Sequence, residues 1–312
     1  MIKIKLECWW TDSGSLINRF IKQFVFDQNE FEFVTSKPDY TIVFGRTNWD
    51  LLETPKERTF YFSQEPLWSP NEPKNDIHNY CSKIFVSDKR EYPDREEYIE
   101  TLLPMFYAGR GDIDSREEWD WSKTLLNKTY NKTKPISIIV RKDYSTHYNH
   151  LSNPETSNVN YILRTDLGIK LSENKNIDIF GTYWENNGEN IKGEMWNKHI
   201  GVDDYQFSVG CENSIQKNYI SEKFWDIILT DGIPIYLGCS NINDYIPENC
   251  FISLNGLTLD EMVIKINDII DNNDKYYNLM IEHIHKLKTD FYQNPKFNLW
   301  EKIKLTIKEN EN

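Results

Sequence analysis

The chain has 312 residues, a length that favours two domains of roughly 150 residues each. Its 39% hydrophobic and 27% charged residues are typical of a folded protein. The net charge of −13 argues against general nucleic-acid binding, because proteins that bind the phosphate backbone of a nucleic acid usually carry an excess of basic residues. A local cluster of hydrogen-bond donors can still hold one small anion.

The five cysteines are widely spaced along the chain: Cys8, Cys81, Cys211, Cys239 and Cys250. An odd count without a Cys-x-x-C pair argues against a disulfide framework and favours reduced thiols in a cytoplasmic setting. The N-terminal residues alternate like a strand and lack the apolar core of a signal peptide. No run of about 18 apolar residues is present, so we expect no transmembrane segment.

Short apolar runs and helical patterns alternate through the N-terminal half. Residues 14–26 carry apolar side chains at helical spacing. Four short apolar runs predict strands: 2–8, 39–45, 59–63 and 83–87. The polar residues 109–135 contain two glycines and end at Pro135, which indicates an interdomain connection.

A second series of strands and helices fills the C-terminal half. The predicted strands are 136–140, 177–181, 205–211, 233–237 and 250–254. The predicted helices are 157–172, 221–230, 258–272, 274–290 and 296–309. Such alternation predicts an α/β fold with two Rossmann-like domains that face a cleft, with ligands bound outside the carboxyl ends of the strands. We expect domains at 1–130 and 131–295, followed by a C-terminal helix and tail at 296–312.

Residues 211–238 are the most informative stretch, because they predict strand, loop, helix, turn and strand in succession. Ser221 is a favourable N-cap, so the helix begins at the carboxyl edge of the sheet, where free N–H groups attract an anion. Lys223 can pair with a phosphate there, and Glu222 can accept hydrogen bonds from a ribose diol. An acidic residue in a first turn also simply complements the helix dipole, so the residues alone leave the role of Glu222 open.

This segment resembles the donor-binding signature of glycosyltransferase family 10, the α-1,3/4-fucosyltransferases. The residues that carry the resemblance are Glu212, Asn213, Ser214, Tyr219, Glu222, Lys223, Pro234 and Gly238, and it continues without a gap through residues 243–252. A match of that length is more specific than a lone Gly-rich pattern. The resemblance implies a GT-B glycosyltransferase in which Asn213, Tyr219, Glu222 and Lys223 hold the nucleotide diphosphate and ribose of a sugar donor.

The N-terminal half carries a second resemblance, because residues 60–70 are similar to the segment where the family places its catalytic carboxylate. Glu65 follows the predicted strand 59–63 and is expected to face the cleft. An inverting transfer needs one base to take the proton of the acceptor hydroxyl. Without the resemblance, Glu65 would be read as a solvated loop carboxylate or a helix cap. Trp9 and Trp10 resemble a Trp pair that follows the first strand in some bacterial members. We expect them to line the acceptor site by stacking on a sugar ring, although core packing is equally compatible with at least one of them.

One departure from the family concerns the cation that holds the donor's diphosphate. The family has an Arg on or near the helix after the first C-terminal strand, and the matching place here reads Ser157-Asn-Val-Asn. A leaving diphosphate needs such a cation as negative charge builds. Arg141 and Lys142, at the end of strand 136–140, can supply it from the same edge, and Lys192 and Lys198 are further candidates. Of these four residues, we assign Arg141 and Lys192 to the donor site.

The sequence therefore predicts an inverting, α-1,3-fucosyltransferase-like enzyme that moves fucose from GDP-fucose to a glycan hydroxyl, with Glu65 as the base. It predicts no cofactor beyond the donor and no obligatory metal, since Asp112 and Asp114 read as solvated linker carboxylates and His147 and His150 as a surface pair. Two alternatives remain open: the same fold with another nucleotide sugar such as UDP-xylose, and a glycan-binding protein without turnover.

Overall fold

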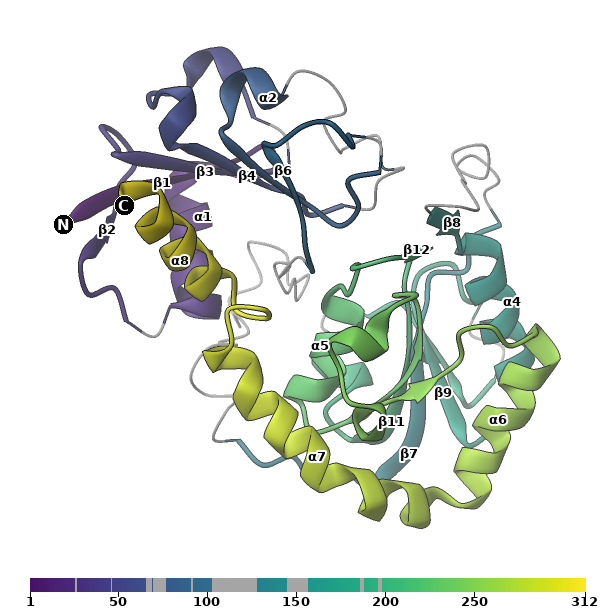
Figure 1. Ribbon diagram of the computed structural model, residues 1–312. Helices are drawn as coiled ribbons and strands as arrows, with labels where there is room; N and C mark the ends of the chain where they lie inside the picture. The colour runs from purple at the N-terminus through teal and green to yellow at the C-terminus, as the bar shows by residue number, and fades with distance from the viewer. Residues whose placement is uncertain are drawn as a thin grey trace.

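The computed structural model describes residues 1–25, 27–45, 47–65, 69, 77–90, 92–102, 128–144, 157–185, 188–195 and 198–312. These residues form two α/β lobes, each built on a six-stranded sheet (Figure 1). The predicted class of two Rossmann-like domains is thus confirmed. Most of the expected linker, and the discounted residues Asp112, Asp114, His147 and His150, lie outside the described residues.

The N-terminal lobe contains a sheet in the order β2-β1-β3-β4-β5-β6, with every neighbouring pair parallel. Its strands are β1 (Ile2–Cys8), β2 (Phe31–Phe33), β3 (Tyr40–Phe44), β4 (Thr59–Phe62), β5 (Lys83–Val86) and β6 (Tyr98–Glu100). The helices are α1 (Ser13–Phe24) and α2 (Ile77–Tyr80), with short 3₁₀ turns at Trp49–Leu51 and Lys56–Arg58. All residues of β3 and β4 are buried, which explains why these strands read as unbroken apolar runs.

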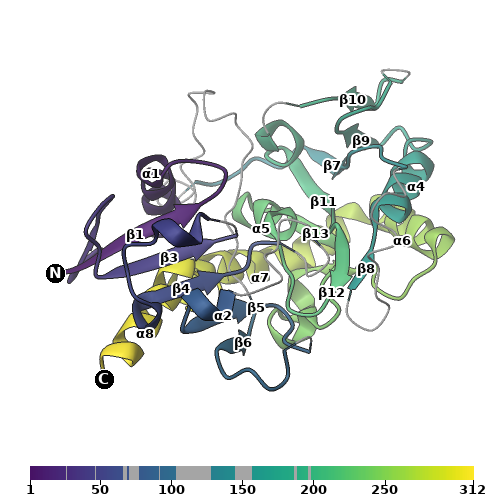
Figure 2. The same ribbon diagram turned by 90° about the horizontal axis from the view of Figure 1, so that it is seen from above.

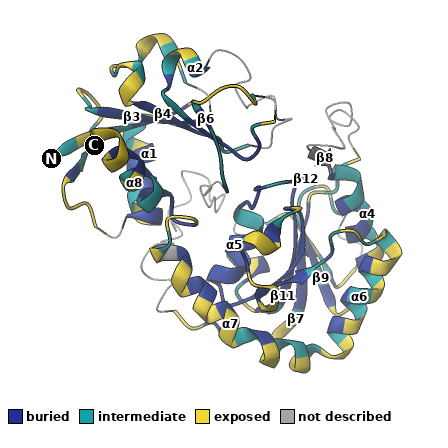
Figure 3. Ribbon diagram, viewed as in Figure 1, coloured by how far each residue is buried: buried dark blue, intermediate teal, exposed yellow. Residues whose placement is uncertain are grey.

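The C-terminal lobe contains a parallel sheet in the order β10-β9-β7-β11-β13-β14. Its strands are β7 (Lys134–Ile139), β9 (Ile177–Phe180), β10 (Ile191–Gly193), β11 (Tyr205–Cys211), β13 (Ile233–Leu237) and β14 (Ile252–Ser253). The helices are α4 (Tyr161–Leu171), α5 (Glu222–Leu229), α6 (Leu259–Asp271) and α7 (Asn273–Gln293), with 3₁₀ turns at Lys198–Gly201, Ile242–Asp244 and Glu248–Cys250. The central strands β3, β4 and β13 are buried along their whole length (Figure 3).

A separate two-stranded antiparallel ladder pairs β8 (Ser157–Val159) with β12 (Ser214–Gln216). The expected helix over 157–172 is therefore wrong at its start, because three of its residues pair as a strand and the helix begins only at Tyr161. A strand of three residues has too short a pattern to be distinguished from the helix that follows it.

The C-terminal helix α8 (Leu299–Glu311) leaves the second lobe and packs on the first (Figure 2). The side chain of Asn298 caps the helix and donates a hydrogen bond to the carbonyl of Phe24 at 3.2 Å. The indole of Trp300 donates to the carbonyl of Asp27 at 2.8 Å, and the Tyr40 hydroxyl donates to Glu311 at 2.6 Å. The last helix therefore ties the end of the chain to its beginning. No helix within the described ranges has both the length and the apolar character needed to cross a membrane.

Candidate functional site

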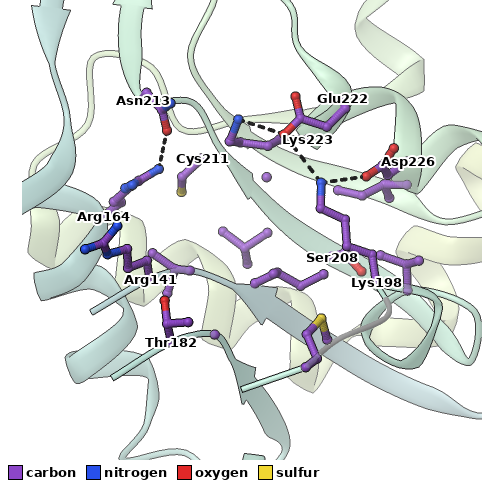
Figure 4. A pocket seen from close by; sticks show the side chains of 18 of the residues that line it. Arg141, Arg164, Thr182, Lys198, Ser208, Cys211, Asn213, Glu222, Lys223 and Asp226 are labelled. Carbon is purple, nitrogen blue, oxygen red and sulfur yellow. Dashed lines mark hydrogen bonds and ion pairs between the residues drawn. The ribbon is translucent and has the colours of Figure 1, made fainter. Parts of the chain in front are cut away.

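A cavity of about 360 Å³ opens at the carboxyl edge of the C-terminal sheet. It lies between the ends of β7, β9 and β11 and the starts of α4 and α5 (Figure 4). The polar side chains that line it are Arg141, Arg164, Thr182, Lys198, Ser208, Asn213, Glu222, Lys223 and Asp226. Four of these carry positive charge, which gives an acidic protein a local site for an anion.

The start of α5 is fixed by the buried carboxylate of Glu212. One oxygen of Glu212 accepts from the backbone N–H of Ser221 at 2.7 Å and from the Tyr236 hydroxyl at 3.1 Å. The other accepts from the Ser221 hydroxyl at 2.6 Å. A Cβ on Gly238 would lie 2.4 Å from the Cγ of Glu212, so only glycine leaves room for this carboxylate. The Glu and the Gly of the sequence motif therefore have a structural role in orienting the helix.

Beside the first turns of α5, Lys223, Glu222, Lys198 and Asp226 form a chain of alternating positive and negative charges, in which Lys198 comes from the 3₁₀ turn Lys198–Gly201. Lys223 Nζ lies 3.0 Å from Glu222 Oε1, and Lys198 Nζ lies 3.4 Å from the same atom. Lys198 Nζ also donates to Asp226 Oδ2 at 2.9 Å. Burial opposes the charged form, yet the ammonium groups of Lys223 and Lys198 hold the pKa of Glu222 well below its usual range. Glu222 is thus an ionised acceptor at the cavity wall.

Arg164 is the cation that the sequence interpretation overlooked. It lies on α4, one turn after the segment Ser157-Asn-Val-Asn, and it lines the cavity. The expectation of no Arg at this place is therefore corrected, since the helix that should carry the Arg begins at Tyr161 rather than at Ser157. Arg164 donates from Nη1 to Asn213 Oδ1 at 2.6 Å. Its buried Nε has no hydrogen-bond partner among the described residues, so this donor is not satisfied by the protein.

The two other cations predicted from sequence lie in different places. Arg141 follows β7 and lines the cavity, where it pairs with Asp143 at 3.4 Å and stacks over the Tyr183 ring at 4.9 Å. Lys192 is not among the described residues that line the cavity: its ammonium lies 3.3 Å from Asp178 Oδ1 and donates to the carbonyl of Glu189 at 2.6 Å. The structure thus brings Arg141, Arg164, Lys198 and Lys223 together and places Lys192 elsewhere.

Tyr219 is a buried residue of the loop before α5. Burial raises the pKa of its hydroxyl, and the carboxylates of Glu212, Glu65 and Glu222 raise it further. Glu65 directly follows Ser63 and Gln64 at the carboxyl end of β4, and its carbonyl accepts from the Ser63 hydroxyl at 3.2 Å. Tyr219 itself is not among the described residues that line the cavity.

Trp9 and Trp10 lie on the same edge of the N-terminal sheet as Glu65, because β1 and β4 flank β3 in a parallel sheet. The side chain of Trp9 is 55% exposed, whereas that of Trp10 is partly buried against the core. The two rings are nearly perpendicular, with centroids 6.2 Å apart. Trp9 therefore offers a free aromatic face at this edge, and Trp10 serves largely in packing.

The two lobes contact each other through the end of β12 and the loop that follows it. The amide of Asn218 donates to the carbonyl of Ser87 at 2.7 Å, Gln216 hydrogen-bonds the Ser87 hydroxyl, and Lys217 pairs with Glu100. Ser87 directly follows β5, so the carboxyl edge of the N-terminal sheet faces the C-terminal lobe. The edge that carries Glu65 and Trp9 thus faces the lobe that contains the cavity.

Two Rossmann-like lobes that face a cleft, with a cationic cavity in the second lobe, define a GT-B glycosyltransferase. Residues 141–302, more than half of the chain, match the family described as Glycosyltransferase family 10 (fucosyltransferase) C-term. The chain therefore belongs to glycosyltransferase family 10.

The curated relatives of the chain are α-1,3-fucosyltransferases, which agrees with the family assignment. The chain is 31% identical over 185 residues to 4-galactosyl-N-acetylglucosaminide 3-alpha-L-fucosyltransferase 9 of Bos taurus, a match that covers 57% of this chain and 46% of the relative. It is 31% identical over 83 residues to Alpha-(1,3)-fucosyltransferase B of Drosophila melanogaster, covering 26% of this chain and 19% of the relative. These matches thus span less than half the length of the relatives.

Solved structures share the fold at low sequence identity. A crystal structure of an α1,3-fucosyltransferase with GDP has a TM-score of 0.52 at 15% identity, covering 94% of this chain and 90% of the other. Anabaena Alr3699/HepE in complex with UDP also has a TM-score of 0.52, at 8% identity, covering 99% and 100%. Because proteins crystallised with either nucleotide share the fold, the fold alone does not select the base of the donor.

Proposed function

We propose that the protein is an inverting α-1,3-fucosyltransferase that moves fucose from GDP-fucose to a hydroxyl group of a glycan. Membership of family 10 and the α1,3-fucosyltransferase relatives support the reaction class. The observation that carries the proposal is the convergence of Arg164, Lys223 and the first turn of α5 on one cavity. Cations at a helix N-terminus are suited to a diphosphate.

The donor is held by residues of the C-terminal lobe in this proposal. Arg164 and Lys223 bind the diphosphate, with Asn213 orienting the Arg164 guanidinium through their 2.6 Å hydrogen bond. Glu222 accepts hydrogen bonds from the ribose diol, for which its ionised carboxylate is suited. As the bond between the sugar and the diphosphate breaks, these cations stabilise the charge that develops on the leaving group.

The acceptor is held by the N-terminal lobe. Glu65 takes the proton of the acceptor hydroxyl as the oxygen attacks the anomeric carbon, which inverts the configuration there. The exposed ring of Trp9 stacks on an acceptor sugar. Support for this division comes from the sheet edge that Glu65 and Trp9 share, which faces the C-terminal lobe through the contact of Asn218 with Ser87.

A transfer assay with Glu65→Gln tests the base. The variant keeps the size of the side chain but cannot accept the proton, so turnover is expected to fall by about 10²-fold or more while GDP affinity stays nearly unchanged. Glu57→Gln, at an exposed position of the same lobe, is the matched control and should retain full turnover. Equal turnover of the Glu65→Gln variant and the parent would overturn the assignment of the base.

A second candidate is the same chemistry with a uridine nucleotide such as UDP-xylose, because the fold is shared with a UDP-bound protein and does not itself select the base. Binding of GDP and UDP to the parent protein separates the two candidates, and a preference for UDP would overturn the fucose donor. A parent that binds glycan and GDP but forms no product would instead indicate a glycan-binding protein without turnover.

We further propose that transfer needs no divalent metal, because protein cations already surround the place assigned to the diphosphate. Arg141, Arg164, Lys198 and Lys223 all line the cavity. Turnover is therefore expected to persist after dialysis against a chelator. If the chelator abolishes turnover and added Mg²⁺ or Mn²⁺ restores it, a metal ion contributes to neutralising the diphosphate, and the proposal is wrong.

A further inference from the structure

The cavity has two chemically different ends. Arg164 and Asn213 lie on one side of it, and Lys198 and Asp226 lie on the opposite side (Figure 4). Apolar side chains also line the cavity, among them Ile139, Met195 and Val202. Two of them lie close to Lys198, because a Cβ placed on Gly201, in the same 3₁₀ turn, would meet Met195 Cε at 2.6 Å and Ile139 Cδ1 at 2.9 Å. An apolar wall beside a few polar groups suits the flat ring of a nucleobase.

Asp226 has a hydrogen-bonding capacity that the protein leaves unused. Its side chain is only 3% exposed, and its Oδ2 accepts from Lys198 at 2.9 Å. Its Oδ1 is buried without a hydrogen-bond partner anywhere in the described part of the chain. A buried carboxylate oxygen without a donor is unfavourable, so the arrangement indicates a donor that arrives with a ligand.

The position of Asp226 on α5 indicates which part of the ligand supplies that donor. Asp226 follows Glu222 by four residues, so the two side chains start from one face of the helix about 6 Å apart along its axis. Glu222 is the proposed ribose partner, and the diphosphate lies toward the N-terminus of the helix. The group attached to the other side of the ribose, one turn further along, is the base.

We propose that Lys198 and Asp226 together read the Watson–Crick edge of guanine in the donor. Guanine presents two adjacent donors, N1–H and the exocyclic amine at C2, beside one acceptor, O6. Asp226 accepts from the two donors after its carboxylate rotates, and Lys198 donates to O6. Uracil has no such pair of adjacent donors, so the same two residues favour a guanosine over a uridine nucleotide. This inference rests on the proposed fucosyltransferase function.

The direct test is calorimetric binding of GDP, IDP and UDP to the parent and to the Asp226→Asn variant. IDP lacks only the amine at C2, so it isolates the hydrogen bond from that amine to Asp226. We expect the parent to bind GDP at least about tenfold more tightly than IDP, since a hydrogen bond to a charged acceptor is lost. Asp226→Asn should bring the two affinities to within about threefold, because a neutral amide oxygen accepts more weakly.

A second variant separates the two residues. Lys198→Met is expected to weaken GDP and IDP equally, because both carry O6, and to leave their ratio unchanged. Lys192→Met and Asp271→Asn, which change the same residue types outside the cavity, should match the parent with all three nucleotides.

The outcomes distinguish this inference from the proposed function. A parent that prefers GDP over UDP but binds GDP and IDP equally would overturn the role of Asp226 and leave the fucose donor intact, even if Asp226→Asn does not fold. A folded Asp226→Asn variant with the same ratio of GDP to IDP affinity as the parent would also overturn the role of Asp226 and leave the fucose donor intact. A parent that prefers UDP would overturn the donor assignment and the inference with it.

Discussion

Arg164 donates a hydrogen bond to the side-chain oxygen of Asn213 at 2.6 Å, and this contact joins the helix α4 to the loop that leads into α5. The guanidinium also lies 4.4 Å from the centre of the Tyr161 ring. Two elements that are distant in sequence thus fix one buried cation at the wall of the cavity. Asn213 belongs to the family signature, whereas Arg164 becomes visible only through the structure.

Replacing Arg164 by Ala should weaken GDP binding by about 10- to 100-fold, because a charge-assisted hydrogen bond to phosphate is lost. Arg164→Lys should recover only part of the affinity, since a lysine cannot bond Asn213 and a phosphate in the same fork geometry. Calorimetric titration measures both. The exposed Arg95→Ala is the control, and equal affinity of Arg164→Ala and the control would exclude Arg164 from the donor site.

Asn218 should be the central residue of the contact between the lobes. Its side chain donates to Ser87 and accepts from Tyr245 and Asn241, and its backbone is in the left-handed region at φ 56°. Asn218→Gly tolerates this backbone but loses the hydrogen bonds, so we expect unfolding free energy to fall by about 2 kcal/mol. Hydrogen exchange should become faster on both sides of the contact.

The neighbouring Lys217→Ala is the control for the Asn218 prediction. Its ion pair with Glu100 is partly exposed, and such pairs contribute at most about 1 kcal/mol. Faster exchange near Ser87 in both variants to the same extent would show that Asn218 has no special role in holding the lobes together.

The sequence predicted the elements that carry their own pattern. The strand β13 is five buried apolar residues, and the helix α5 begins at a Ser that caps it, so both are readable locally. The signature residues Asn213, Glu222 and Lys223 meet at one cavity because they flank the same strand end and helix start. A site made by one contiguous segment is thus largely predictable from its residues.

The remainder of the site depends on contacts between distant segments. Arg164 was missed because β8 takes three residues that resemble the start of a helix, and only pairing with β12 defines that strand. Lys192 and Lys198 are six positions apart in a polar stretch, and no periodicity shows which one reaches α5. The short strands β2, β6 and β10 likewise form through their neighbours in the sheet.

Removal of the Trp300 side chain should strongly destabilise the N-terminal lobe. The indole is fully buried, packs on Phe20, Phe31 and Phe33, and donates to the carbonyl of Asp27. Trp300→Ala is therefore expected to lower the unfolding free energy by about 3–5 kcal/mol in a urea titration. The half-exposed Leu305 on the same helix is the control, and Leu305→Ala should change it by less than about 1 kcal/mol. Similar values for the two variants would contradict a central role of α8 in that lobe.

Lys132 should make stability depend on pH, because burial lowers the pKa of its ammonium to about 7 while Asp203 and Asp231 oppose the shift only in part. Its Nζ donates to the carbonyl of Val202 at 2.9 Å. Between pH 7 and the ordinary lysine pKa of 10.5, the unfolded chain binds the proton and the folded chain does not. Stability therefore rises with pH through this window, and below it the full penalty for burying the charge applies.

Lys132→Met removes this penalty. The variant should melt at a temperature about 2 °C or more above the parent at pH 6.5, and the difference should be clearly smaller at pH 9.5, because the penalty disappears only as the pH approaches 10.5. Scanning calorimetry at the two pH values measures it, with the exposed Lys296→Met as the control that shows no such trend. A gain that is the same at both pH values would mean that Lys132 stays charged in the folded protein, held by Asp203 and Asp231 more strongly than its burial indicates.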